Sequence, residues 1–551
     1  MDEPFIVDAE RKGFYGLFLI GEVPTLGDRK LPADLALIRG NVRTMNVAQP
    51  LAQAVAMKEG KIVKVGSNEE VSHLIGKQTK VIDLDGKTVV PGFIDTHIHV
   101  ADFGRCLLWL DLTAADSIGE LLSLLAGKAA QTPAGKWIIG RGWNETRFKE
   151  QRLPNLSDLD AVAPDNPVIL YREAVMTCVV NRKAIALAGV TEQTAVPAGG
   201  VIDKKPSGKL TGIFRDTATN LIWQAVPEPT VEELVEASAL ALQKIAEAGI
   251  TSIHWILISQ GEFRIVRRLE AEGKLPVRVN VIVPCEFLKE TDGFKPKDPA
   301  MLRVVGVFIT TDGYLDSKTA ALTLPYSDDP ANSGKMLLTP QELAVAVDRV
   351  LQLGLEPVIH AMGDKAIDAA LKVIEQATPA DGTRFRMEQA AVLNRELVKR
   401  LKTSNVIVTV QPTVIATEFA VWSATTRLGL ERAKLLHPIK TLLDAGVRVA
   451  GGSDCPMEPL SPLLGMQKTV QRDSFPEQHL TDEEALRMYT VDAAYCSGEE
   501  NVKGSIEEGK MADMTVLSED PFAVAPEKIR DICVEMTVIN GKSVFDKQLN
   551  R

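Results

Sequence analysis

The stretch Val89-Val90-Pro91-Gly92-Phe93-Ile94-Asp95-Thr96-His97-Ile98-His99 is an apolar run with strand character that ends in two histidines. Side chains two residues apart on a strand point to the same side, so His97 and His99 can bind one metal ion. Paired histidines are often only structural, but the chain has 7 histidines in all and two of them end this run. The stretch therefore predicts a metal site at the end of a buried strand.

Length and composition predict a globular protein with more than one domain. The chain has 551 residues, which exceeds the roughly 250 to 300 residues that usually share one hydrophobic core. Hydrophobic residues make up 45% and charged residues 25% of the chain, and the formal net charge is -11. No cluster of Lys and Arg is interleaved with aromatic residues, so we expect no nucleic-acid partner.

The first residues and the cysteines bear on the compartment. Met1 to Pro4 are acidic where a secretory signal would be basic, and the apolar run Phe14 to Ile20 is too short to span a membrane. The 6 cysteines form no Cys-x-x-Cys pair, which suits reduced thiols. We therefore expect a cytoplasmic protein with no membrane partner.

Both ends of the chain have short β-type runs separated by glycines. The tail contains Asn540-Gly541, a pair typical of hairpin turns. We expect residues 33–92 and 497–551 to pair into one composite β-sandwich domain. Residues 1–32 precede this domain as an N-terminal extension.

Between the two ends, helical patterns followed by apolar strands repeat, which indicates parallel β/α units. In one unit, Thr230 and Glu233 form a capping box and Gly249 ends the helix. The count of strands is the number needed to close a (β/α)8 barrel of the TIM type. The expected strands are Val89–Asp95, Ile250–His254, Val277–Val283, Val304–Ile309, Pro357–His360, Phe385–Met387, Val406–Val410 and Val447–Gly451. We assign residues 93–496 to the barrel, with about 105–229 inserted as a cap over its mouth.

Active sites of such barrels lie at the C-terminal ends of the strands. His97 and His99 end strand 1, His360 ends strand 5, and Asp454 follows strand 8. Three imidazoles and a carboxylate leave room for one water and suit one divalent transition metal, first Zn, with Fe or Mn as alternatives. Each residue alone has an ordinary structural explanation, but the four together favour a metal site.

The chain resembles the amidohydrolase superfamily, and within it the branch of YtcJ-like proteins and N-substituted formamide deformylases. Beyond the opening His-x-His motif, the matching motifs are Gly142-Trp143, Leu153-Pro154 with Asp158-Leu159-Asp160, Asp312-Gly313 with Thr319-Ala320-Ala321-Leu322, His360-Ala361-Met362-Gly363-Asp364-Lys365-Ala366, Gly452-Ser453-Asp454-Cys455-Pro456 and Gly509-Lys510-Met511-Ala512-Asp513. The resemblance implies a metal-dependent hydrolase that acts on C–N bonds other than peptide bonds.

The sequence also departs from this family. The family's strand 4 lysine, which can bridge two metals, falls on Phe308, and its strand 6 histidine falls on Gln389. A second metal would lose two ligands, so the resemblance implies a mononuclear site. Polar family positions in the cap and after strand 2 fall on Met176 and Trp255. The residues expected to line a more hydrophobic substrate pocket are Met176, Trp255, Phe308, Gln389, Asp312 and Trp143.

Three functional hypotheses follow. The first is a hydrolase that cleaves a largely apolar amide, formamide or carbamate with a metal-activated water, in which Asp454 moves the proton and Gln389 donates a hydrogen bond. The second is a heterocycle deaminase with the same mononuclear site. The third is a catalytically weak or engineered scaffold with an altered pocket. The expected partner is a small-molecule substrate, and a homodimer is left open.

Overall fold

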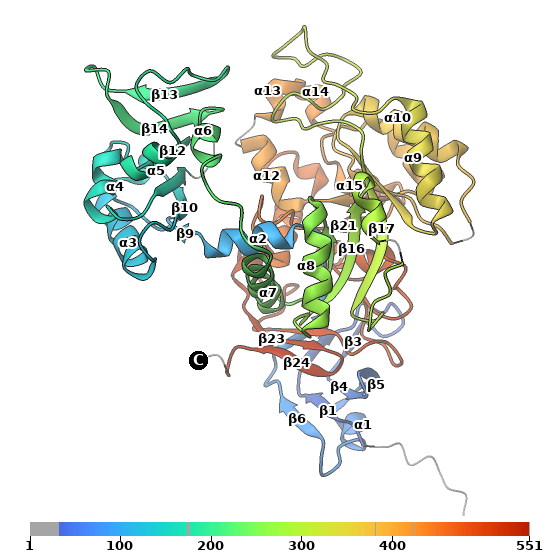
Figure 1. Ribbon diagram of the computed structural model, residues 1–551. Coiled ribbons are helices and arrows are strands. Elements are labelled where there is room, and N and C mark those ends of the chain that lie inside the picture. Colours follow the sequence, from blue (N-terminus) through green and yellow to red (C-terminus); the bar gives the residue numbers. More distant parts are fainter. Residues whose placement is uncertain (1–31, 173–176, 292, 381, 421–422, 550–551) are drawn as a thin grey trace, which may run out of the picture.

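The computed structural model describes residues 32–172, 177–291, 293–380, 382–420 and 423–549. The two ends of the chain form two sheets at the base of the molecule (Figure 1). A four-stranded sheet contains β5 (Lys61–Gly66), β4 (Ala54–Lys58), β1 (Leu35–Ile38) and β6 (Lys80–Asp83), in that order, with α1 (Asn68–Ser72) beside it. A six-stranded sheet contains β24 (Lys542–Asp546), β23 (Val534–Ile539), β22 (Met514–Leu517), β7 (Thr88–Pro91), β2 (Asn41–Arg43) and β3 (Leu51–Ala52).

The two chain ends meet where β22 pairs antiparallel with β7. Apolar side chains from both sheets share one buried cluster, which includes Leu37, Val55, Val89, Met514 and Val538. Burial of this common face stabilises the domain although its strands lie more than 400 residues apart in the sequence. The composite β-sandwich predicted from both ends is therefore confirmed.

Eight parallel strands form the central sheet. In order they are β21 (Val449–Gly451), β20 (Ile407–Val410), β19 (Arg386–Gln389), β18 (Glu356–Ala361), β17 (Leu302–Thr310), β16 (Arg278–Pro284), β15 (Ile250–Ile256) and β8 (Phe93–Ile98). The two end strands meet, because Thr96 Oγ1 donates to Gly451 O at 2.9 Å and Ile98 forms a parallel bridge with Cys455. The predicted (β/α)8 barrel is therefore confirmed.

The first strand differs from the prediction. The expected strand Val89–Asp95 is divided, since Thr88–Pro91 belong to β7 of the terminal sheet and Phe93–Ile98 to β8 of the barrel. Gly92 lies between them, and a Cβ there would be 2.2 Å from the Thr251 side chain. Only glycine fits where the chain passes this close to β15 and changes sheets.

Helices surround the barrel. They are α2 (Val100–Leu108), α7 (Val231–Glu247), α8 (Gln260–Ala271), α9 (Pro340–Gln352), α10 (Asp364–Gln376), α11 (Arg395–Thr403), α12 (Pro412–Ala420), α13 (Ala424–Leu428), α14 (Leu430–Ala433), α15 (Ile439–Asp444), α16 (Pro462–Val470), α17 (Asp482–Met488) and α18 (Val491–Tyr495). The predicted capping box of Thr230 and Glu233 opens α7. Among the described residues, no helix has both the length and the apolar character needed to cross a membrane.

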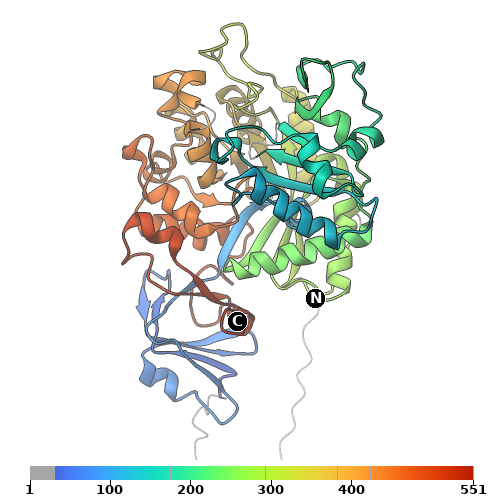
Figure 2. The same ribbon diagram turned by 90° about the vertical axis from the view of Figure 1, so that its left-hand side faces the viewer.

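The segment between α2 and α7 forms a separate layered unit, drawn in cyan to green (Figures 1 and 2). Its six-stranded sheet contains β13 (Gly200–Lys204), β14 (Leu210–Asp216), β12 (Thr177–Val180), β11 (Val168–Arg172), β10 (Ile138–Trp143) and β9 (Leu110–Asp111). Its helices are α3 (Ile118–Gln131), α4 (Leu156–Val162), α5 (Arg182–Leu187) and α6 (Thr219–Trp223). The inserted cap expected from the long connection is present, and α2 and α7, which pack together, join it to the barrel.

A buried ion pair connects the barrel and the β-sandwich. Arg278 on β16 donates to Asp513 at 2.6 and 2.9 Å and to Asn540 at 2.6 Å. Both charged side chains are almost fully buried, at 2% and 3% exposure. Asp513 is the acid of the Gly-Lys-x-Ala-Asp motif, so this motif has a structural role at the domain junction.

Candidate metal centre

Backbone hydrogen bonds connect the two loops that carry the proposed ligands. The Asp454 N–H donates to His97 O at 2.8 Å, and the His99 N–H donates to Cys455 O at 3.0 Å. The buried carboxylate of Asp95 accepts from the N–H groups of His97 and Ser453, at 3.1 and 2.9 Å. These hydrogen bonds hold the ends of β8 and β21 side by side.

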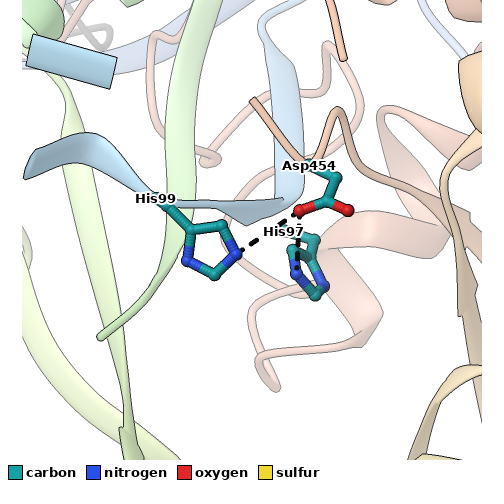
Figure 3. Close-up of side chains that lie close together, drawn as sticks. All are labelled: His97, His99 and Asp454. Atoms are coloured by element: carbon teal, nitrogen blue, oxygen red, sulfur yellow. Dashed lines mark ion pairs between the residues drawn. The ribbon is translucent and has the colours of Figure 1, made fainter. Parts of the chain in front are cut away.

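His97, His99 and Asp454 come together in a geometry suited to a metal ion. Asp454 Oδ1 lies 3.5 Å from His97 Nε2 and 3.4 Å from His99 Nε2 (Figure 3). Bonds of about 2.1 Å in a tetrahedral site place neighbouring ligand atoms about 3.4 Å apart. The three donor atoms lie within 4.8 Å of one another, so the spacing fits one ion between them.

His360 faces this group from the end of β18 but lies outside the close set of three. Its side chain is buried, and among the described residues neither ring nitrogen has a hydrogen-bond partner. Unpaired buried nitrogens are costly, and a bound ion would account for one of them. Burial lowers the pKa of His360 to about 4, so its imidazole is neutral near pH 7, the form that binds metals.

The charges around the two strand 1 histidines favour a cation. Burial lowers the pKa of His99, but the nearby Asp454 carboxylate outweighs burial, and the net shift of the His99 pKa is upward. Glu388 lies 2.8 Å from His97 Nδ1. Burial raises the pKa of Glu388, but the positive charge of Arg386 and the hydrogen bond from His97 lower it by more, to about 2. Two carboxylates, Asp454 and Glu388, thus flank the imidazoles.

Phe308 and Gln389 lie at the ends of strands beside the group. The Phe308 ring lies 6.2 Å from the His97 ring and 6.1 Å from the His360 ring, measured between centroids. A hydrocarbon ring at this place supplies no metal ligand. Gln389 ends β19 with a left-handed backbone, φ 70°, and its buried Oε1 has no hydrogen-bond partner in the part of the chain that the structure describes.

Asp312 lies behind His360. Its buried carboxylate accepts from the N–H groups of Ala321, Met362 and Gly363, at 2.8 to 2.9 Å, and lies 3.7 Å from His360 Nδ1. Burial raises the pKa of Asp312 to about 6. With no exposed surface, Asp312 holds the loop after β18 in place instead of facing a substrate.

Trp255 and Trp143, which were expected to line the pocket, lie away from the proposed metal ligands. Trp255 is fully buried and its Nε1 donates to Glu262 of α8 at 3.0 Å, so the indole lies in the helix layer outside the barrel. Trp143 lies in the core of the cap, where it donates to Leu170 O at 2.9 Å and stacks on Phe148. Side chains alternate between the two faces along β15. Because the neighbouring His254 points into the barrel, the Trp255 side chain points outward. Met176, also expected in the pocket, lies outside the described residues.

Three further residues at the site were not singled out from the sequence. Tyr314 follows Asp312 and Gly313, is 51% exposed, and places its ring 5.2 Å from the His360 ring. Glu388 and Gln411 contact His97 from inside the barrel. Tyr314 could have been found as a polar residue just after strand 4, whereas Glu388 and Gln411 gave no comparable signal.

A (β/α)8 barrel with a His-His-Asp cluster at its strand ends has the architecture of a metal-dependent hydrolase. The amidohydrolase family model matches residues 80–545. The chain is 34% identical over 523 residues to the putative amidohydrolase YtcJ of Bacillus subtilis (strain 168), covering 92% of this chain and 98% of that protein. It is 29% identical over 541 residues to N-substituted formamide deformylase of Arthrobacter pascens, covering 93% and 98%.

A crystal structure of an uncharacterized metal-dependent hydrolase from Pyrococcus horikoshii OT3 has the same fold, with a TM-score of 0.72 and 30% sequence identity over 90% of this chain and 99% of that one. The chain belongs to the amidohydrolase family. It is therefore an amidohydrolase, a hydrolase that acts on C–N bonds other than peptide bonds.

Proposed function

We propose that this enzyme hydrolyses the C–N bond of an N-formyl, N-acyl or carbamoyl derivative of a largely apolar amine, at a site that holds one divalent transition ion. The named relative that deformylates N-substituted formamides supports this substrate class. The proposal also includes zinc as the ion, with Fe or Mn as alternatives, because imidazole and carboxylate ligands suit all three.

One observation carries the proposal. The Nε2 atoms of His97 and His99 both face the same oxygen of Asp454, at 3.5 and 3.4 Å. Each ring has an acceptor beside its Nδ1, so in the neutral rings Nε2 carries a lone pair that points at the Asp454 carboxylate. A cation between these atoms would turn this repulsion into attraction. Together with the ring nitrogens of His360, which have no hydrogen-bond partner among the described residues, the two contacts with Asp454 support the proposal of one ion at this place.

The mononuclear proposal depends on Phe308 and Gln389. A second ion would need donors on β17 and β19, where this chain has a hydrocarbon ring and a neutral amide. The Phe308 ring also lies beside both the His97 and the His360 rings. The apolar ring of Phe308 beside the proposed ion supports the proposal of an apolar substrate.

The chemistry assigns a role to each residue. His97, His99, Asp454 and His360 would hold the divalent ion, which would supply a bound water with a pKa of about 7 and a Lewis acid for a carbonyl group. Asp454 takes the proton of the attacking water and delivers it to the leaving nitrogen, acting first as base and then as acid. Gln389 and Tyr314 donate hydrogen bonds toward the substrate oxygen, which gains negative charge as the tetrahedral carbon forms.

A substrate screen tests the proposal. Purified enzyme is stripped of metal, reloaded with Zn²⁺, Fe²⁺ or Mn²⁺, and assayed for amine release from N-formyl, N-acetyl and carbamate derivatives of benzylamine and of longer alkylamines. We expect release from at least one derivative, lost after chelation and restored by metal. Release of ammonia from aminated heterocycles, with no release from the acylated amines, would instead identify a deaminase.

The cysteines support a further part of the proposal, a cytoplasmic location. All 6 cysteines are unpaired, and Cys178, Cys455 and Cys496 are buried. Reduced thiols suit a reducing compartment. Fractionation of the producing cells, with the enzyme followed by antibody, measures the location directly.

A further inference from the structure

A buried pair of opposite charges, Arg386 and Glu388, lies beneath the proposed metal ligands. The two residues are two positions apart on β19, so both side chains point into the barrel. Their side chains are 1% and 0% exposed. A charged pair at this depth is expensive to desolvate, so its presence calls for a specific role. The contacts of the pair point to His97.

Glu388 contacts the side of the His97 ring opposite to the proposed ion. Glu388 Oε2 lies 2.8 Å from His97 Nδ1, while His97 Nε2 faces Asp454. A carboxylate can only accept, so Nδ1 carries the proton and Nε2 keeps its lone pair. Gln411 Nε2, 3.2 Å from Nδ1 and 3.5 Å from the same Glu388 oxygen, adds a second donor to that carboxylate.

Arg386 holds Glu388 and the backbone of the ligand strand at once. It forms an ion pair with Glu388 Oε1 and donates to the carbonyl oxygen of Thr96, the residue before His97. It also donates to His254 Nδ1 at 2.7 Å and to Thr409 Oγ1 at 3.2 Å. Strands β8, β15 and β20 therefore meet at one guanidinium group, which leaves Glu388 little freedom to move.

His99 is oriented differently. Its Nδ1 lies 3.0 Å from the carbonyl oxygen of Ile256, so a main-chain group sets its tautomer. Of the two strand 1 histidines, only His97 depends on a side chain for its orientation. Substitution of one residue can therefore disturb one ligand and leave the other in place.

We propose that Glu388, held in place by Arg386, is a positioning residue that fixes the tautomer and orientation of His97 for metal binding. The inference rests on the proposed function, because it takes His97 as a metal ligand. A carboxylate behind a ligating imidazole also raises the basicity of the imidazole, and loss of such a partner typically costs about 10- to 100-fold in metal affinity.

The experiment compares metal affinity in three variants. Glu388→Gln keeps the shape and removes the charge, and Glu388→Asp keeps the charge on a side chain shorter by one methylene. Glu418→Gln is the matched control, because Glu418 is also a buried glutamate near a histidine, 3.9 Å from His437 Nε2, but does not contact His97. Each metal-free protein is titrated with Zn²⁺ against a chromophoric chelator and with Co²⁺ by visible absorption, after circular dichroism has shown that it is folded.

We expect Glu388→Gln to bind Zn²⁺ about 10- to 100-fold more weakly than the unchanged enzyme, with an altered Co²⁺ spectrum, and Glu388→Asp to fall between the two. Glu418→Gln should keep the affinity and spectrum even if its melting temperature changes. If Glu388→Gln does not fold, Glu388→Asp alone must show the loss. Unchanged affinity and spectrum in the Glu388 variants would overturn the inference, with metal binding by the unchanged enzyme still standing. Failure of the unchanged enzyme to bind any ion would overturn both this inference and the proposed function.

Discussion

Replacement of Phe308 by alanine tests how the pocket is shaped. The ring lies about equally far from His97 and His360, at centroid distances of 6.2 and 6.1 Å, and packs against Ile256, Ile282 and Val358 inside the barrel. Removing it opens space beside the proposed ion. Because the ring is only partly buried, we expect a stability loss of about 1 to 3 kcal/mol, below the cost at a fully buried position.

The effect on selectivity is of about the same size in free energy as the effect on folding. Accommodating or excluding even one methylene in a pocket changes kcat/KM about 10- to 200-fold. For Phe308→Ala we therefore expect the ratio of kcat/KM for N-benzoyl over N-formyl substrates to rise at least about tenfold. The assay measures amine release from matched formyl, acetyl and benzoyl derivatives, with Phe308→Leu as a smaller change at the same place.

Trp255→Phe is the control, because the structure places that indole in the helix layer. The substitution removes the hydrogen bond to Glu262 and should lower the melting temperature without changing the selectivity ratio. An unchanged ratio in Phe308→Ala, or a changed ratio in Trp255→Phe, would show that the assignment of these two aromatic residues is wrong.

Three further predictions concern the ion, a substrate contact and the domain junction. Elemental analysis of metal-loaded enzyme should give close to one transition ion per chain, and a reproducible value of two would contradict the role given to Phe308. Tyr314→Phe should lower kcat by about 10²- to 10³-fold with little change in KM and none in metal content, whereas Ser317→Ala in the same loop should leave kcat unchanged; equal kinetics in both variants would remove Tyr314 from the mechanism. Asp513→Ala leaves the buried guanidinium of Arg278 without its partner, and chemical denaturation should show a loss of about 3 to 5 kcal/mol; a loss below about 1 kcal/mol would mean that water or Asn540 compensates.

Much of the fold could be predicted from local patterns. The helix-then-strand repeat predicted the barrel because amphipathic helices and buried parallel strands have different periodicities. The boundary of the first strand was wrong, because the contact between Gly92 and Thr251 that ends β7 joins residues far apart in the sequence. A glycine inside an apolar run signals such a break only weakly.

The pocket could be predicted less well than the ligands. His97, His99 and Asp454 come together because strand ends of a closed barrel share one face. Trp255 lies away from them because its neighbour His254 points into the barrel, and neighbouring residues of a strand point to opposite faces. Family resemblance placed Trp255 at a strand end but could not determine its direction.

The sequence by itself determined the fold class, the family and the candidate ligands, because these depend on residue types at strand ends and on short motifs. Only the tertiary structure decided that Glu388 and Arg386 support His97, that Asp312 holds a loop, and that Tyr314 lies beside His360. The physical reason is that hydrogen bonds and charge pairs act over a few ångströms in space. Glu388 and His97, for example, lie 291 positions apart in the chain.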